Sequence, residues 1–202
     1  MFTGKRVGLI TNATGVDSKF RRTVDILHEK VNLVTLYAPE HGLRGNVVAG
    51  AAVPYETDGR TGLPIYSLHG DTRKPTAAML KNIDVLAFDI QDIGARSYTY
   101  IYTMAYAMQS AREHNKTFVV FDRPNPVGGI KVEGGLLKSD YSSFIGLYPI
   151  PIRHGLTVGE LARLFNEEFG IGARLVVIPM QGWTRRMQQA ETGLPWVMTS
   201  PN

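Results

Sequence analysis

The sequence predicts an α/β fold: a Rossmann-like, mostly parallel sheet with helices on both faces. Short apolar runs alternate along the chain with segments in which apolar residues recur at helical spacing. Most of these runs are continuous, as in strands that are buried on both sides of a sheet. The chain has 202 residues, 44% of them hydrophobic, which is enough for one sizeable core. We therefore expect one layered domain of this class.

The first part of the chain predicts three strands, one helix and one irregular region. Phe20, Val24 and Leu27 recur at helical spacing between two apolar runs. Glycine and proline are frequent after the second run, which disfavours regular structure there. The expected elements are, in order, a strand over 6–11, a helix over 19–30, a strand over 31–36, an irregular region over 42–64 and a strand over 65–68.

The rest of the chain continues the alternation of helices and strands. Thr157 and Glu160 stand in the Thr-x-x-Glu pattern of a capping box, and the helix after them has an apolar face. The loop-rich segment 127–151 is expected to cover another part of the molecule. The expected elements are a helix over 75–82, a strand over 83–90, a helix over 98–114, a strand over 117–121, a helix over 157–170, a strand over 174–178 and a tail of short helix and extended loop from 182.

Composition excludes several functional classes. The net charge of +4 is modest, and the basic residues are scattered, so nucleic-acid binding is not indicated. Because the chain has no cysteine, it has no disulfide, thiolate nucleophile or zinc-thiolate site. No run approaches the roughly 18 apolar residues of a membrane span, and no signal peptide precedes the first strand.

The common nucleotide-binding and hydrolase motifs are also missing. The chain has no Gly-x-Gly-x-x-Gly after its first strand, no phosphate-binding Gly-Lys-Ser/Thr loop and no Gly-x-Ser-x-Gly elbow. Candidate metal ligands exist, but none has the spacing of a ligand pair on a helix. These candidates are Glu40, His41, Asp89 and Asp92. We expect neither a metal nor another cofactor.

Polar residues follow four of the predicted strands. In open parallel sheets, ligands bind beyond the carboxyl ends of the strands. The residues in these places are Asn12, Glu40 with His41, Asp89 with Gln91 and Asp92, and Asp122 with Arg123 and Asn125. The sequence therefore predicts a functional site at this edge of the sheet.

The loop after the second strand is the strongest candidate for catalysis. Pro39 restricts the residue before it, and Gly42 and Gly45 permit turns that other residues cannot form, so Glu40 should project from a rigid bend. A glutamate in the wall of a pocket can donate a proton, and we predict that Glu40 is a general acid. The alternative is a structural salt bridge from Glu40 to Arg44.

The loop over 89–98 is a second candidate. It places two carboxylates, an amide, a guanidinium and a phenol within ten positions. This set suits sugar recognition, because amides and carboxylates bind paired hydroxyls and aromatic rings offer flat faces. The alternative role for Asp92 is to cap the next helix. The stripe of Tyr98, Tyr102 and Tyr106 is expected to pack in the core.

Four arginines are candidates for binding a carboxylate or a phosphate through paired hydrogen bonds. They are Arg44, Arg96, Arg123 and Arg153. The alternative for Arg123 is a structural ion pair with its neighbour Asp122, and His154, next to Arg153, is a further binding candidate. Three histidines that stand alone in the sequence are expected to be structural or at the surface. They are His28, His69 and His114.

Several long motifs occur in the order found in a known family. They cover residues 39–42 (PEHG), 88–96 (FDIQDIGAR), 122–126 (DRPNP), 132–134 (VEG) and 149–160 (PIPIRHGLTVGE). With these motifs the chain resembles the exo-β-N-acetylmuramidase family, once known only as a domain of unknown function, over nearly its whole length. The resemblance implies removal of N-acetylmuramic acid from the non-reducing end of peptidoglycan fragments, with Glu40 as the catalytic glutamate.

The resemblance also implies a domain division and a location. Residues 1–182 resemble a Rossmann-like catalytic domain, and residues 183–202 resemble the start of a linker toward a second, smaller domain that is absent from this chain. The cleft would lie between the two domains. By the same resemblance, the protein is expected to be secreted or periplasmic.

A glycosidase needs an acid and usually a second carboxylate. We predict Asp92 for the second role, with Asp89 and Asp122 behind it, and the N-acetyl group of the substrate is an alternative. An arginine would suit the lactyl carboxylate of muramic acid. The predicted substrate-binding residues are Asn12, His41, Arg44, Asp89, Gln91, Arg96, Tyr98, Asp122, Arg123, Asn125, Arg153 and His154.

Two other functions stay open from the sequence. The first is a non-catalytic cell-wall sugar-binding module, which the many planar polar groups would suit. The second is a Rossmann-type enzyme acting on a nucleotide or a phosphorylated metabolite, which fold analogy alone suggests. The expected partners are peptidoglycan-derived saccharides and not nucleic acids, and the sequence leaves the oligomeric state open.

Overall fold

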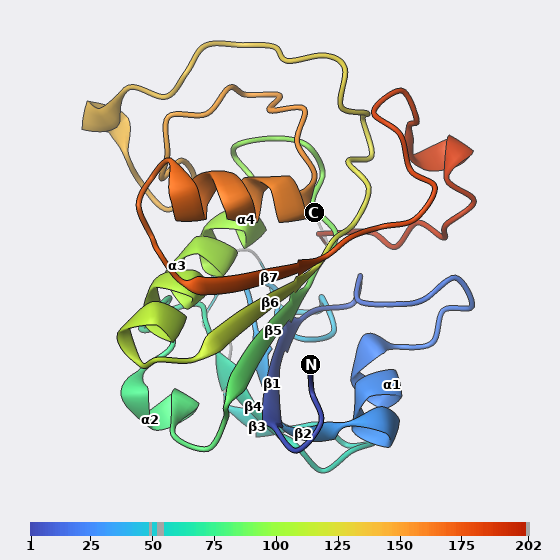
Figure 1. Ribbon diagram of the computed structural model, residues 1–202, viewed down its shortest axis with the longest axis vertical. Coiled ribbons are helices and arrows are strands. Elements are labelled where there is room, and N and C mark those ends of the chain that lie inside the picture. Colours follow the sequence, from blue (N-terminus) through green and yellow to red (C-terminus); the bar gives the residue numbers. More distant parts are fainter. Residues whose placement is uncertain (49, 52–54, 201–202) are drawn as a thin grey trace.

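A mostly parallel sheet forms the centre of the protein, shown in Figure 1 as a computed structural model. The structure describes residues 1–48, 50–51 and 55–200. Within them, seven strands lie in the order β3-β4-β2-β1-β5-β6-β7, and only the β3–β4 pair is antiparallel. The strands are β1 (Arg6–Thr11), β2 (Asn32–Ala38), β3 (Glu56–Thr57), β4 (Pro64–Ser67), β5 (Val85–Asp89), β6 (Thr117–Phe121) and β7 (Arg174–Ile178).

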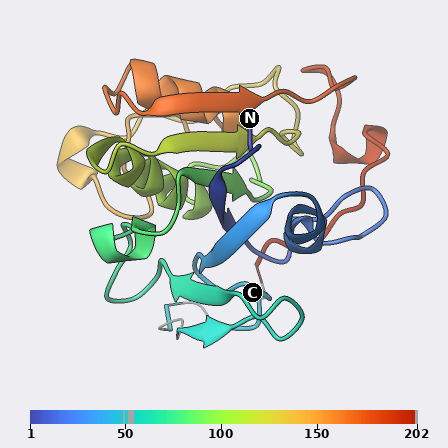
Figure 2. The same cartoon turned by 60° about the horizontal axis from the view of Figure 1, so that its bottom comes forward.

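Helices cover both faces of the sheet, as Figures 1 and 2 show. One face carries α1 (Thr23–Lys30), and the other carries α2 (Ala77–Leu80), α3 (Tyr100–Glu113) and α4 (Val158–Glu167). The chain first adds strands on one side of β1, beginning with β2, and later adds β5, β6 and β7 on its other side. Because crossovers between parallel strands are right-handed, opposite directions place the helices on opposite faces. The predicted fold class is confirmed.

Each face of the sheet has its own apolar core. On one face, Val24 and Leu27 of α1 belong to a buried cluster with strand residues. On the other, Tyr102 of α3 and Phe165 of α4 lie in a larger cluster, and both are fully buried. Tyr106 stacks on Phe144 with ring centroids 6.2 Å apart. Core packing of these two tyrosines is therefore confirmed, and the two cores fix the strand ends between them.

The start of α1 is the main boundary that the sequence predicts wrongly. The helix begins at Thr23, four residues later than expected. Phe20 has a φ of 59°, and the carboxylate of Asp17 accepts hydrogen bonds from the backbone N–H groups of Lys19 (2.8 Å) and Arg21 (2.9 Å). An aspartate that binds nearby backbone groups competes with a helix for them, so a turn forms here instead.

The irregular segments connect distant parts of the molecule. The region 42–64 contains the short strand β3 and the first residue of β4, and residues 49 and 52–54 within it lie outside the described residues. The segment 127–151 includes η1 (Ser139–Tyr141) and covers α4, where the ring of Tyr148 lies 4.7 Å from those of Phe165 and Phe169. The tail contains the short helix η2 (Gln189–Glu191). Among the described residues, no helix is long and apolar enough to cross a membrane.

Candidate active site at the carboxyl ends of the strands

Glu40 lies just beyond the carboxyl end of β2, at the sheet edge where the sequence predicts a site. Its Oε2 atom accepts a hydrogen bond of 2.8 Å from the hydroxyl of Thr99, the residue before α3. Its Oε1 atom accepts a 3.2 Å bond from the backbone N–H of Gly50. The side chain is 15% exposed. The carboxylate is therefore oriented by two donors and retains access to solvent.

His69 is the closest ionisable neighbour of Glu40. β2 and β4 are neighbouring strands (Figure 2), and in their parallel pairing Ala38 lies opposite Ser67. Glu40 and His69 each follow these paired residues by two positions, so the register brings them together. The Nε2 atom of His69 lies 3.7 Å from Oε1 of Glu40, and the side chain is only 7% exposed. Of the two alternatives expected for His69, structural or at the surface, its burial leaves the first.

His41 joins the Glu40 loop to the end of the chain. Its backbone has a φ of 69°, a left-handed conformation between Glu40 and Gly42. The Nδ1 atom lies 2.9 Å from the carbonyl oxygen of Val47, so Nδ1 carries the proton that this acceptor needs. The Nε2 atom lies 3.3 Å from the hydroxyl of Ser200. The imidazole is buried and holds the bend that presents Glu40.

The tail returns to the same edge of the sheet. The hydroxyl of Tyr98 lies 2.9 Å from that of Thr199, and Tyr100 donates a 2.6 Å bond to the carbonyl oxygen of Thr199. Tyr98, a predicted substrate-binding residue, therefore contacts another part of the chain instead of standing free. The segment 199–200 lies next to the Glu40 loop.

Arg44 is the most exposed of the four candidate arginines. Its side chain is 56% exposed, and its Nη2 atom lies 3.8 Å from Oδ1 of the buried Asp58. With Asn12 and Leu43 it lines a hollow of about 280 Å³. The alternative of a brace between Glu40 and Arg44 is wrong, because Asp58 is the partner of Arg44 and Glu40 has other donors.

Asp89 and Arg123 form a buried ion pair. Nε and Nη2 of Arg123 donate to the two carboxylate oxygens over 2.6 Å and 3.0 Å, and Thr23 adds a hydroxyl hydrogen bond. Nη2 of Arg123 also donates to the carbonyl oxygen of Val16 (3.1 Å). Burial lowers the pKa of Arg123, but Asp89 outweighs it and raises the pKa above its usual value. The pair fixes the loop after β1, and the alternative pairing of Arg123 with Asp122 is wrong.

Asp122 connects β6 to the start of α4. Its Oδ1 atom accepts from the backbone N–H groups of Gly159 (2.8 Å) and Arg123 (3.0 Å), and its Oδ2 atom accepts from the hydroxyl of Thr157 (3.1 Å). Burial raises the pKa of Asp122, although these hydrogen bonds favour the charged form. All three contacts lie within the protein, so the carboxylate serves to position the helix.

Asp92 and His154 face each other in the interior. The Nε2 atom of His154 lies 3.2 Å from Oδ2 of Asp92, which also accepts a 2.8 Å bond from the backbone N–H of Gly94. The Nδ1 atom of His154 accepts from the N–H of Leu156 (3.1 Å), so its proton lies on Nε2. Asp92 is only 4% exposed. It does not cap the next helix, which begins at Tyr100.

The three candidate amides brace the loops at this edge of the sheet. Asn12, Gln91 and Asn125 are each buried. Their hydrogen bonds join Asn12 to Thr14 (2.6 Å), Gln91 to Pro124 (2.8 Å) and Asn125 to Leu156 (2.9 Å). Asn12 therefore braces its own loop, whereas Gln91 and Asn125 tie the loop after β6 to its neighbours.

The other two candidate arginines bind the covering segment. Arg96 donates from Nη1 to the carbonyl oxygens of Gly135 (2.8 Å) and Ile150 (2.7 Å). Arg153 pairs with Glu133 over 2.8 Å and donates to the carbonyl oxygen of Val127. Their guanidinium groups hold the segment 127–151 in place. Their predicted role in substrate binding stays a prediction.

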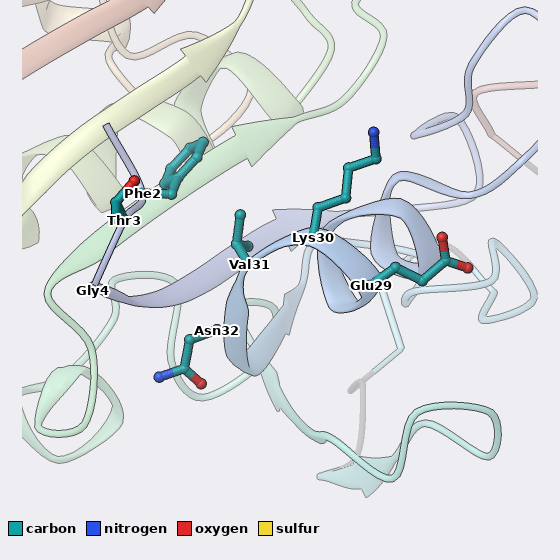
Figure 3. A pocket seen from close by; sticks show the side chains of 7 residues that line it. All are labelled: Phe2, Thr3, Gly4, Glu29, Lys30, Val31 and Asn32. Carbon is teal, nitrogen blue, oxygen red and sulfur yellow. The ribbon is translucent and has the colours of Figure 1, made fainter.

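A hollow of about 620 Å³ lies at the opposite edge of the sheet, lined by residues 2–4 and 29–32. In Figure 3 the labelled polar side chains of Glu29, Lys30 and Asn32 point in different directions. No set of polar groups converges there, so the Glu40 edge is the better candidate for chemistry. The described residues also contain no cluster of three side chains placed to hold a metal ion.

The fold and site define a Rossmann-like α/β domain with an oriented, accessible glutamate at the carboxyl ends of its strands, a class suited to acid–base chemistry. The family profile described as "Exo-beta-N-acetylmuramidase NamZ, N-terminal" matches residues 7–202. The chain belongs to this family, as its motifs predict.

Relatives agree in sequence and in structure. Peptidoglycan beta-N-acetylmuramidase NamZ of Bacillus subtilis (strain 168) is 56% identical over 201 residues, which cover 98% of this chain and 49% of that protein. A DUF1343 family protein of Bacteroides fragilis NCTC 9343 has a crystal structure that matches with a TM-score of 0.91 at 55% identity, covering 98% of this chain and 51% of its own. A second such protein from this organism has a TM-score of 0.79 at 38% identity, covering 92% and 50%. The chain thus spans about half the length of these relatives.

Proposed function

We propose that this chain supplies the general acid of an exo-β-N-acetylmuramidase, which releases N-acetylmuramic acid from the non-reducing end of peptidoglycan fragments. Family membership and the name of the Bacillus relative support this activity. We also propose a secreted or periplasmic location, because the substrate is part of the cell wall. The division into a catalytic domain over 1–182 and a linker over 183–202 stays a prediction.

Glu40 carries the proposal. Hydrolysis of a glycosidic bond needs an acid that protonates the leaving oxygen. Among the candidate carboxylates, Glu40 combines partial exposure with fixed orientation by Thr99 and Gly50. Asp89 and Asp122 are instead surrounded by donors from within the protein. After protonating the leaving group, the Glu40 carboxylate would take a proton back from the attacking water.

The second catalytic group is better assigned to the substrate than to Asp92. Asp92 is buried and faces His154, which limits its approach to a sugar. The oxygen of the N-acetyl group lies within the substrate itself and can act as the nucleophile. A substrate with an N-trifluoroacetyl group, whose oxygen is a weaker nucleophile, is then expected to react more slowly. Equal rates for the two substrates would contradict this assignment.

Arg44 is the best candidate for recognising the lactyl carboxylate of muramic acid. Its guanidinium is exposed, and it lies four residues from Glu40. Arg44→Gln is expected to raise KM for a muraminide and to leave KM for the matching glucosaminide unchanged, because only the former carries the carboxylate. Arg60→Gln is the control, since Arg60 is exposed and pairs with Asp25. A KM change of the same size for both sugars would contradict a carboxylate contact.

The decisive experiment measures release of a chromogenic aglycone from a β-N-acetylmuraminide. Glu40→Gln is expected to lower turnover by about 10²- to 10⁴-fold, the usual contribution of a general acid. Glu29→Gln is the matched control, because Glu29 is exposed and lies at the opposite edge of the sheet. The position aligned with Glu40 is also changed to Gln in the full-length Bacillus relative, of which this chain covers 49%.

The outcomes separate the competing functions. Unchanged turnover in both Glu40→Gln proteins would remove Glu40 from the mechanism. Binding of muropeptides without turnover, unaffected by Glu40→Gln, would favour a sugar-binding module. A nucleotide or phosphorylated metabolite that raises the melting temperature would favour the Rossmann-type alternative.

A further inference from the structure

The closest ionisable neighbour of Glu40 comes from a strand end that the sequence analysis did not associate with chemistry. We propose that His69 is a positioning residue for Glu40, and that its neutral imidazole turns Nε2–H toward the Glu40 carboxylate. The effect of this pair on turnover rests on the proposed function of Glu40, whereas the pairing itself does not.

The sheet fixes the distance between the two side chains. Ala38 and Ser67 are paired in adjacent parallel strands, and Leu68 donates a backbone hydrogen bond of 2.8 Å to Ala38. The hydroxyl of Ser67 then bonds to both the N–H (3.1 Å) and the carbonyl oxygen (2.7 Å) of His69. The backbone of His69 is thereby held, and its Nε2 atom remains 3.7 Å from the Glu40 carboxylate.

The far side of the imidazole favours its neutral form. Its Nδ1 atom is buried and has no hydrogen-bond partner among the described residues. The ring of Phe144 lies 6.1 Å from that of His69, centroid to centroid. A doubly protonated imidazolium would leave an N–H at Nδ1 buried without an acceptor, whereas the neutral ring needs only the Nε2 side toward Glu40 to be polar.

Burial and two basic neighbours favour the neutral imidazole. Burial is the largest influence and lowers the pKa of His69. Glu40 opposes this effect, and Arg73 and His41 lower the pKa further. The guanidinium of Arg73 lies 4.3 Å from the centroid of the Phe144 ring, on which Tyr106 also stacks. His69 therefore resists protonation to the imidazolium, and its neutral ring presents Nε2–H to Glu40.

This arrangement has a consequence for turnover. When Glu40 gives its proton to the glycosidic oxygen, it is left as a carboxylate beside Nε2–H of His69. The carboxylate then takes a proton from the attacking water, while the imidazole keeps its own. Without His69, the carboxylate lacks this neighbour, so kcat would fall while KM stays the same.

The first test measures the pairing without any activity. The imidazole signals of the protein are followed by NMR as the pH changes, and the His69 signal is identified by its loss in His69→Gln. Glu40→Gln is expected to shift the His69 titration to lower pH, and Arg73→Gln to shift it to higher pH. His28→Gln, at an exposed position on α1, is the control. A His69 titration that is the same in the natural protein and in Glu40→Gln would overturn the proposal.

The second test measures kcat and KM in the full-length relative and in this chain. His69→Gln, or the substitution aligned with it, is expected to lower kcat by about tenfold and to leave KM unchanged, because the acid is less well positioned. His28→Gln is expected to change neither. An unchanged kcat in His69→Gln would refute the positioning role even where Glu40→Gln abolishes turnover. If Glu40→Gln retains full turnover while its NMR shift occurs, the proposed function fails and the pair stands.

Discussion

Two acidic sites lie at the same edge of the sheet and differ in how their charges are balanced. Asp89, after β5, has both oxygens bound by Arg123 and receives a further hydroxyl from Thr23. Glu40, after β2, has one hydroxyl donor, one backbone donor and a histidine 3.7 Å away. The Asp89 carboxylate is buried, whereas the Glu40 side chain is partly exposed.

This difference separates structural from chemical roles. A buried carboxylate with every acceptor position occupied by its own protein stabilises the loops that bind it, and it has little capacity left for a substrate. A carboxylate that is oriented but incompletely bound can accept and donate a proton during a reaction. Residue type and strand-end position are shared by both sites, so the hydrogen-bond partners decide the role.

The largest expected effect is on the structural site. Asp89→Ala leaves the Arg123 guanidinium buried without its partner, and it removes the acceptor of the Thr23 hydroxyl. We expect the free energy of unfolding to fall by about 3–5 kcal/mol, as when one member of a buried ion pair is lost. Urea denaturation measures it.

Asp71→Ala is the control for the loss of an acidic side chain, because Asp71 is exposed. It is expected to change stability by no more than about 0.5 kcal/mol. A similar small change in Asp89→Ala would mean that the Asp89–Arg123 pair does not hold the loops. Asp89 would then no longer be the example of a structural carboxylate in this comparison.

A smaller effect is expected where Asp122 supports α4. The Thr157 hydroxyl accepts from the N–H of Glu160 (3.2 Å) and donates to Asp122 (3.1 Å), and the Glu160 side chain completes the predicted capping box. Thr157→Ala is expected to lower stability by about 1–2 kcal/mol, because a helix cap and a buried hydrogen bond are both lost. Thr3→Ala, at an exposed position, is the control in the same urea titrations. Equal stability of the two variants would show that this cap is dispensable.

The sequence predicts the frame of the protein well, because the frame depends on local pattern. The apolar run of β6 ends at Asp122 and that of β7 ends at Pro179, and Thr157 with Glu160 marks the start of α4. The motif that contains Glu40 also lies where it is expected. Strand ends could thus be located from periodicity alone.

The partners of the polar residues could not be predicted in the same way. Arg123 pairs with Asp89, 34 positions earlier, and not with its neighbour Asp122. His69 follows a four-residue strand, and only the strand order places it beside Glu40. The signal that could have revealed His69 is its position after the predicted strand 65–68, because that strand also ends at the ligand-binding edge. The sequence identifies the candidate polar residues, but long-range pairing decides which of their side chains remain available to a substrate.

A substitution beside Glu40 is expected to change activity more than stability. Thr99→Val removes the hydroxyl that orients Glu40 and keeps the shape of the side chain. We expect a stability change of roughly 0.5–1.5 kcal/mol, typical of one hydrogen bond, and about tenfold lower turnover because the acid is less well oriented. Thr99→Ser retains a hydroxyl and is the matched control. Loss of turnover in Thr99→Ser equal to that in Thr99→Val would argue against orientation as the cause.

The smallest expected effect is a change in how stability depends on pH. Because the folded protein lowers the pKa of His69, chiefly by burial, the unfolded chain binds a proton on this residue at a pH where the folded protein does not. The contribution of His69 to stability is therefore present above the ordinary histidine pKa of about 6.5 and is lost as the pH falls below it.

In urea titrations from about pH 7.5 to pH 5, His69→Gln is expected to lose less stability than the natural protein. His28→Gln should behave like the natural protein, because His28 is exposed. Identical pH dependence in all three proteins would mean that folding does not change the pKa of His69, and the contrast between the Asp89 site and the Glu40 site would then rest on Glu40 alone.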